Sequence, residues 1–161
     1  MRGLAACLLL LALLLGLGGC LDQKKGETVY AVYYLNQEEG EEAALVAENR
    51  PLPQDTEPIE GLLTLLLTEP EEEDLDCAVP EGVTLRKWSL HNGLLTVDFS
   101  SGYGTLSGID LTLADYSVVL TMTQLEEVST VMITVDGEML PYRDHQRMTA
   151  EDAWSVLLPD G

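Results

Sequence analysis

The chain has 161 residues, with 28 Asp and Glu residues against 8 Lys and Arg residues and a formal net charge of −20 at pH 7. This length suits one domain with a single core rather than two domains. An acidic domain of this kind repels nucleic acid and anionic lipid head groups, so we expect no nucleic-acid partner. The three cysteines stand far apart, at positions 7, 20 and 77, which excludes a cysteine metal cluster.

The first 19 residues have the layout of a secretory leader. One cation, Arg2, precedes a stretch of 14 mainly apolar residues, whereas a helix that spans a bilayer needs about 20. The exit sequence Leu17-Gly18-Gly19-Cys20 resembles the lipobox of bacterial lipoproteins. This resemblance implies that the chain is cut before Cys20 and that the Cys20 thiol carries diacylglycerol. We therefore expect a lipoprotein signal peptide over residues 1–19; the alternative is an ordinary leader with an incidental cysteine.

Residues 20–28 would then form a lipidated tether that holds the protein to the extracytoplasmic face of the cell membrane. Cleavage before Cys20 leaves 142 residues with a net charge of −21, because Arg2 is removed with the leader. Lys24 and Lys25 lie beside the lipid, where each is expected to gain about 1 kcal/mol from an anionic membrane surface. The sequence thus predicts a basic tether below a strongly acidic domain.

Two strands and a helix are predicted after the tether. Val29 to Leu35 is a run of β-branched and aromatic residues, which favours a buried strand. Residues 44–52 predict a returning edge strand that ends near Pro51 and Pro53. From Thr56 onwards, leucine and isoleucine recur at the spacing of one helical face, with a proline in the first turn, so this segment predicts a helix.

An acidic segment follows this helix. Six carboxylates lie between Glu69 and Asp76, and a run of like charges usually forms a solvated loop. Calcium takes about six to eight oxygen ligands, which makes these side chains weak candidates for a metal site. The ligand spacing and central glycine of an EF-hand are missing, so we expect no bound metal. The weak candidates are Glu71, Glu72, Glu73, Asp74 and Asp76.

The dipeptide Asn92-Gly93 suits the two-residue turn of a β-hairpin, because both positions of such a turn adopt positive φ. The pairs expected on the core face are Leu90–Leu95, Trp88–Val97 and Arg86–Phe99. Lys87 and Asp98 are expected opposite each other on the solvated face, as an ion pair worth a few tenths of a kcal/mol.

Residues 100–108 are rich in glycine and serine, which predicts a flexible connector. Thr112 with Asp115 predicts the capping box of a second helix, whose apolar ridges indicate that it is well buried. Thr149 with Asp152 predicts, in the same way, the start of a short tail helix.

Residues 128–135 predict one more strand. The predicted fold is therefore α+β: a single compact domain of approximate order β-β-α-β-β-α-β, with two helices packed on a small mixed sheet and a short C-terminal helix. Its expected boundaries are residues 29–140, followed by a C-terminal tail over residues 141–161.

Several short motifs resemble the GerMN domain of sporulation, germination and envelope lipoproteins. They are the helix end LLLTEP, the hairpin segment PEGVTLRKWSLHNGLLTVDFS and the segment VVLTMTQLEEVSTVMITVDGE, which together cover most of residues 29–140. The chain departs from the family at Glu69, where a glycine is usual, and in the acidic run that follows. The resemblance implies a small α/β domain related to ring-building modules of the sporulation secretion apparatus, and it implies no catalytic residues.

Residues with reactive side chains do not form a recognisable catalytic motif. His91 flanks the hairpin turn and His145 lies in the tail, and neither is accompanied by a nucleophile motif such as Gly-x-Ser-x-Gly. Cys77 lies among carboxylates, which oppose thiolate formation, so an inert thiol is expected. We therefore expect neither an enzyme activity nor a cofactor.

Four aromatic residues, Trp88, Tyr103, Tyr116 and Trp154, are candidates for stacking on cell-wall glycan. Trp88 is expected on the core face of the hairpin and Tyr116 on a buried helix. Tyr103, in the glycine-rich segment, is the one expected to be free. Core packing is therefore favoured over glycan binding for this set.

The sequence predicts a non-enzymatic, membrane-anchored lipoprotein whose domain recognises or assembles with other proteins in sporulation, germination or envelope assembly. An acidic surface and free strand edges suit protein recognition, including strand addition, better than chemistry. The first alternative is an accessory module that binds peptidoglycan. The second is a weak hydrolase.

Overall fold

The computed structural model describes residues 28–37, 44–52, 55–143 and 145–157. The predicted leader, lipobox and Cys20 lie outside these residues. The elements are β1 Val29–Asn36, β2 Leu45–Pro51, α2 Pro58–Leu66, β3 Leu75–Asp76, β4 Leu85–His91, β5 Leu94–Phe99, the 3₁₀ helix η1 Ser101–Thr105, α3 Gly108–Met122, β6 Thr130–Val135, β7 Glu138–Met139 and α4 Ala150–Leu157. In this part of the chain, none of the helices has the length and apolar character needed to cross a bilayer.

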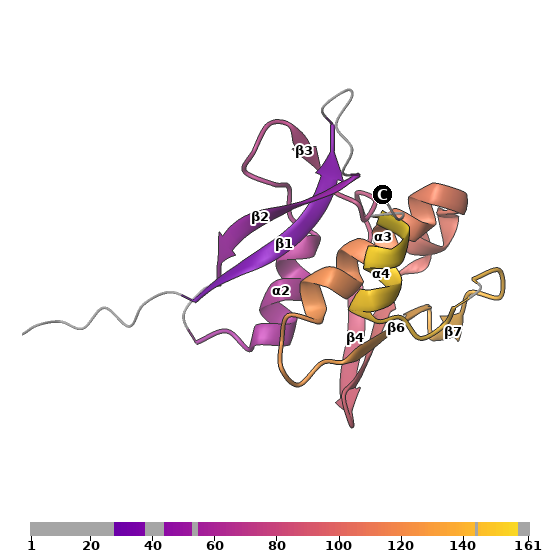
Figure 1. Ribbon diagram of the computed structural model, residues 1–161. Coiled ribbons are helices and arrows are strands. Elements are labelled where there is room, and N and C mark those ends of the chain that lie inside the picture. The colour runs from indigo at the N-terminus through magenta and orange to yellow at the C-terminus, as the bar shows by residue number, and fades with distance from the viewer. Residues whose placement is uncertain (1–27, 38–43, 53–54, 144, 158–161) are drawn as a thin grey trace, which may run out of the picture.

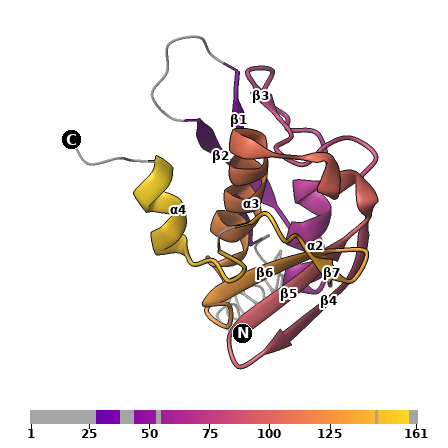
Figure 2. The ribbon, with the colours of Figure 1, turned by 90° about the vertical axis from the view of Figure 1, so that its right-hand side faces the viewer.

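The α+β class and the order of the main elements are as predicted, but the strands form two sheets (Figure 1). The first sheet has the order β2-β1-β3 and is antiparallel; the second has the order β4-β5-β6-β7, in which only the β5–β6 pair is parallel. Helix α3 contacts β1 of the first sheet and β6 of the second. Figure 2 shows α2 and α3 between the two sheets, so the core has helices as its middle layer.

Helix α3 is the central element of this core. The predicted ridge along α3 is buried, which confirms that the apolar residues at helical spacing face inward. Its predicted members are Leu111, Ala114, Val118, Met122 and Leu125, of which Leu125 is buried but lies just after the end of α3. Two polar residues of α3, Ser117 and Thr121, are also buried, and their place is explained by β1.

Side chains of α3 close the edge of β1 that β2 leaves free. Thr121 Oγ1 accepts the Tyr33 amide at 3.1 Å, and Ser117 Oγ donates to the Tyr33 carbonyl at 2.5 Å. Gln124 accepts the Ala31 amide at 3.1 Å and donates to the Ala31 carbonyl at 2.7 Å. One face of α3, together with Gln124 just after its end, thus supplies hydrogen bonds that a neighbouring strand would make.

The other sheet edges carry features that oppose strand addition. Strand β2 has the inward-facing charges Glu48 and Arg50 and ends at Pro51, while β4 has Lys87 next to a β-bulge at Arg86. Strands β3 and β7 have two residues each. Inward charges, edge lysines, bulges and very short strands all discourage pairing with another chain. The strand addition considered from the sequence is therefore disfavoured at these edges.

The predicted hairpin turn is confirmed, with φ of 50° at Asn92 and 80° at Gly93. The register is also as predicted near the turn, where Leu90 pairs with Leu95 and Trp88 is opposite its expected partner. The expected Arg86–Phe99 pair is wrong, because the bulge shifts the register so that Leu85 stands opposite Phe99.

Lys87 and Asp98 stand opposite each other as predicted, but the ion pair expected between them is wrong. Asp98 is only 2% exposed, and its carboxylate lies 3.3 Å from Arg86 Nε. It also accepts hydrogen bonds at 2.7 Å from the Thr134 hydroxyl and from the Gly137 amide. Asp98 thus fixes the turn between β6 and β7 from inside the sheet, and Lys87 stays exposed.

Two predictions around α3 are wrong. The helix begins at Gly108, and Thr112 Oγ1 donates to the Gly108 carbonyl at 3.1 Å instead of capping the helix. The glycine-rich segment is not an open connector, because it folds into η1 and buries Tyr103, whose ring stacks on Phe99 at 4.9 Å between centroids.

The predicted tail helix is confirmed, with the Asp152 amide donating to Thr149 Oγ1 at 3.3 Å.

Candidate functional site

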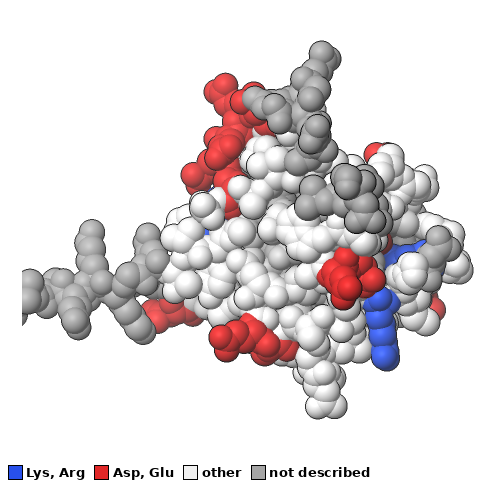
Figure 3. Space-filling model, viewed as in Figure 1, with Lys and Arg blue, Asp and Glu red and all other residues white. Residues whose placement is uncertain are grey.

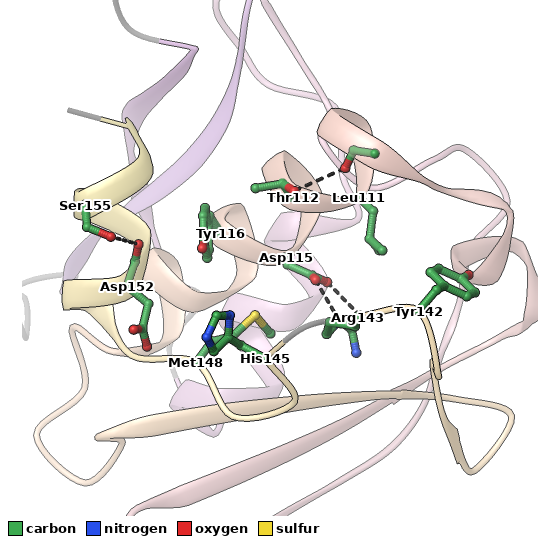
Figure 4. A pocket seen from close by; sticks show the side chains of 11 residues that line it. Leu111, Thr112, Asp115, Tyr116, Tyr142, Arg143, His145, Met148, Asp152 and Ser155 are labelled. Atoms are coloured by element: carbon green, nitrogen blue, oxygen red, sulfur yellow. Dashed lines mark hydrogen bonds and ion pairs between the residues drawn. The ribbon is translucent and has the colours of Figure 1, made fainter. Parts of the chain in front are cut away.

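A groove of about 490 Å³ lies between α3, α4 and the segment that joins β7 to α4 (Figure 4). Helix α3 supplies Asp115 and Tyr116, the joining segment supplies Tyr142 and His145, and α4 supplies Asp152. The groove is open to solvent and has both polar and apolar surface. It is the candidate functional site of the described part of the chain.

One wall of the groove rests on a buried ion pair. Arg143 Nε and Nη2 donate to the two carboxylate oxygens of Asp115 at 2.7 and 2.8 Å, and Nη1 donates to the Ile133 carbonyl at 2.8 Å. The Tyr103 hydroxyl donates to the same carboxylate at 2.8 Å. Burial raises the pKa of Asp115 more than Arg143 and Tyr103 lower it. The pair therefore joins η1, α3, β6 and the tail into one unit.

The Asp152 carboxylate is only partly used inside the protein. Its Oδ2 accepts hydrogen bonds at 2.8 Å from the amide and the hydroxyl of Thr149. These bonds lower the pKa of Asp152, so this side chain is ionised at neutral pH. Oδ1 accepts no hydrogen bond from any residue that the structure describes, which leaves it available to a ligand.

Tyr116 and His145 stand beside this carboxylate (Figure 4). Burial raises the pKa of Tyr116, and the negative charges of Asp152 and Asp115 raise it further. The Tyr116 hydroxyl therefore stays protonated and can donate a hydrogen bond. The His145 side chain is exposed. Neither side chain forms a hydrogen bond with another described residue, so both polar groups face the open groove.

The groove contains residue types that hydrolases use, but they are not arranged as a catalytic unit. The Ser155 hydroxyl donates to the Asp152 backbone carbonyl at 2.8 Å, and within the described residues no hydrogen bond links it to His145. His91, the other histidine, ends β4 and does not border the groove. A nucleophile and its base need direct contact, which this arrangement does not provide.

Cys77 is half-buried and its thiol lies 3.6 Å from the Thr68 carbonyl. Burial raises the pKa of Cys77, and Asp76 and Glu69 raise it further. The thiolate is therefore disfavoured, in agreement with the environment expected from the sequence.

The acidic segment is more ordered than a solvated loop. Glu48 Oε1 accepts the amides of Glu71 and Glu72 at 2.8 Å each, while its Oε2 pairs with Arg50 at 2.9 Å. Figure 3 shows acidic side chains gathered over the part of this segment that leads into β3. Across the described residues, no three His, Cys, Asp or Glu side chains are close enough together to hold one metal ion.

The aromatic candidates occupy different environments. Tyr103 is fully buried, so the expectation that it is free to stack is wrong, and Trp88 is half-buried. Trp154 packs edge-on against Tyr33 with centroids 6.0 Å apart. Tyr116 alone among the four sequence candidates lines the groove. Tyr142, which is 52% exposed, also lines it and was missed because nothing in its local sequence marks it.

The buried pair of Asp115 and Arg143 was also missed, although the sequence holds a signal for it. Asp115 lies one turn after Leu111 and one turn before Val118, on the apolar ridge of α3. An acidic residue on a buried ridge needs a cationic partner. Because this acidic chain has few arginines, Arg143 is one of the few possible partners that the sequence offers.

Solved structures share this fold. The tandem GerMN domains of the sporulation protein GerM from Bacillus subtilis match with a TM-score of 0.66 and 18% identity, covering 79% of this chain and 48% of that one, so the chain spans about half of the tandem structure. The first GerMN domain of GerM gives a TM-score of 0.66 and 18% identity over 78% of this chain and 99% of that one. A candidate lipoprotein from Clostridium perfringens matches with a TM-score of 0.52 and 15% identity, covering 79% of this chain and 90% of that one. The fold is therefore that of a GerMN domain.

The Germane family model, described as "Sporulation and spore germination", matches residues 31–141. Because this match covers more than half of the 161 residues, the chain belongs to the Germane family. No curated protein matches the chain significantly. The match ends just before Tyr142 and Arg143, so α3 belongs to the family domain while the opposite wall of the groove lies beyond the match.

Proposed function

We propose that the protein is a lipoprotein anchored through Cys20 to the extracytoplasmic face of the cell membrane, where its GerMN domain recognises or assembles with other proteins. The observation that carries this proposal is the order of parts along the chain. A short apolar leader ends in a lipobox-like sequence, and residues 20–28 then lead directly into a domain of a sporulation and germination family. The process served is sporulation, germination or envelope assembly.

The lipid on Cys20 is the anchor in this proposal. A single acyl chain gives marginal membrane binding at about 0.8 kcal/mol per buried methylene, whereas two chains make residence durable.

We also propose that this role is not enzymatic. The Ser155 hydroxyl is bonded to a backbone carbonyl, the Cys77 thiol has a raised pKa, and Arg143 is held by Asp115. These three groups are thus engaged in the fold or poorly activated. These features favour recognition over catalysis.

Cys20→Ser should abolish incorporation of labelled palmitate and move the protein from the detergent phase to the aqueous phase in a detergent partition experiment. In the organism that encodes this chain, the variant should also fail to restore heat-resistant spore number or germination to a deletion strain. The physical reason is that a hydroxyl at this position cannot form the thioether to diacylglycerol.

Cys7→Ser and Cys77→Ser are the matched controls, because they remove the other two thiols of the chain. Both should retain the label and the detergent-phase partition. Persistent labelling of Cys20→Ser would overturn the anchor. Full restoration of sporulation and germination by an unanchored protein would show that the anchor is not needed for the role.

A peptidoglycan-binding accessory role is the second candidate, and the groove favours it. The groove presents polar groups that have no partner among the described residues, beside exposed aromatic surface. Retention of the protein on purified cell wall in moderate salt would support this role, whereas complete recovery in the wash would favour the assembly role alone.

A further inference from the structure

We propose that the groove between α3 and α4 binds a neutral, hydroxyl-rich ligand, and that this ligand is a segment of cell-wall glycan. The inference rests on the proposed extracytoplasmic location for the source of the ligand. The binding chemistry itself follows from the residues of the groove.

The ionic groups of the groove argue against an anionic ligand. Asp115 and Arg143 neutralise each other through two hydrogen bonds of 2.7 and 2.8 Å. Asp152 is stabilised by two hydrogen bonds from Thr149 at its helix start. Among the described residues of the groove, the buried Asp115–Arg143 pair therefore offers no net charge to a ligand, and an anion would meet the ionised Asp152.

The groups that remain match the hydroxyls of a sugar. Asp152 Oδ1 is a free acceptor, the Tyr116 hydroxyl is a donor, and the imidazole of His145 can act as either. Sugar hydroxyls donate and accept within one ring, so they can satisfy all three groups at once. A purely apolar ligand would leave these groups without partners, which costs free energy.

The apolar surface of the groove suits the other face of a sugar ring. The Tyr116 and Tyr142 rings line it from different elements, and Met148 lies beside His145 near Tyr116 (Figure 4). Aromatic rings present an apolar face with a polar tip, which is the combination that a sugar needs. Tyr142 is 52% exposed, so part of this surface is open to solvent.

The groove is held in shape before any ligand binds. Arg143 anchors the joining segment to the Ile133 carbonyl, and Met148 forms a backbone bridge with Val131 through hydrogen bonds of 2.8 and 2.9 Å. The Tyr142 hydroxyl donates to the Gly104 carbonyl at 3.0 Å. A preformed site loses little conformational entropy on binding.

The test uses the mature chain from residue 20 with Cys20→Ser, so that every described residue is present. Tetra-N-acetylchitotetraose is the probe, and isothermal titration calorimetry measures its binding. Tyr116→Phe keeps the ring and removes the hydroxyl, and His145→Ala removes the imidazole. Because one hydrogen bond is worth about 1 kcal/mol, each change should weaken binding about 5-fold.

Matched controls are Tyr30→Phe and His91→Ala, which make the same changes at residues that do not line the groove. Both should bind like the parent chain. When the chain with an unchanged groove is titrated with the probe, amide chemical shifts should change in α3, α4 and the joining segment. This measurement does not require that the groove variants fold.

A neutral ligand predicts that affinity is nearly constant between about 0.05 and 0.5 M NaCl, because no ion pair is screened. Absence of binding, shifts outside the groove or equal losses in the controls would overturn the proposal. Binding of a lysine-rich peptide in place of the sugar, lost in high salt, would also overturn it. Failure here leaves the membrane anchor intact, since palmitate labelling of Cys20 is measured independently.

Discussion

Replacing Arg143 with methionine should lower the free energy of unfolding by about 3–5 kcal/mol, because removal of one partner leaves the other charge buried. Among the described residues, the Asp115 carboxylate would keep the Tyr103 hydroxyl as its one hydrogen-bond partner, and the Ile133 carbonyl would lose the Arg143 donor. Methionine has a similar length, so the loss reports the missing charge more than a missing volume. Urea denaturation followed by circular dichroism measures it.

Arg147→Met is the control for this prediction. Arg147 is exposed and lies in the same segment, so its replacement should change the free energy of unfolding by less than about 0.5 kcal/mol. Similar losses for the two variants would show that Arg143 is not a special partner of Asp115.

The pH dependence of the Arg143→Met loss is a second check on the same pair. Burial already raises the pKa of Asp115, and removal of the cation should raise it further. An acid whose pKa is higher in the folded than in the unfolded state takes up a proton on folding, so its cost to stability decreases as the pH falls. The loss should therefore shrink between about pH 7 and about pH 4.

Glu48→Ala should also cost about 3–5 kcal/mol, because it leaves Arg50 without its buried partner. The same carboxylate holds the amides of Glu71 and Glu72, so hydrogen exchange at these two amides should accelerate together. Chemical denaturation measures the first effect, and exchange followed by NMR measures the second.

Glu71→Ala is the matched control on the other side of Arg50. The Glu71 side chain is 73% exposed, whereas that of Glu48 is 5% exposed. Glu71 Oε1 lies 3.5 Å from Arg50 Nε. An exposed partner contributes at most about 1 kcal/mol. Because the Glu71 amide remains in this variant, its exchange should stay slow. Fast exchange of both amides in both variants would contradict the assigned role of Glu48.

Local signals were sufficient to predict much of the fold. The Asn92-Gly93 turn set the hairpin register up to Lys87, and the apolar spacing on α3 identified its buried ridge. The cap of the tail helix follows from Thr149 and Asp152 alone. In each case, residues close in the sequence determine the geometry, so the pattern is sufficient.

Features that depend on distant partners could not be predicted in the same way. Asp115 suggested a capping box by its spacing from Thr112, but its true partner is Arg143, 28 residues away. The glycine-rich segment suggested a connector. Its Tyr103 instead stacks on Phe99 and donates a hydrogen bond to Asp115, so it is part of the core. Half of the groove comes from the tail, whose position depends on these contacts.

The mass of the N-terminal peptide tests the central claim most directly. Trypsin digestion of the protein purified from membranes should give a peptide that begins at Cys20, ends at Lys24 and carries diacylglycerol on the cysteine. The account predicts this modified peptide and no peptide from the leader. A peptide that retains the leader, or an unmodified Cys20 thiol, would contradict it.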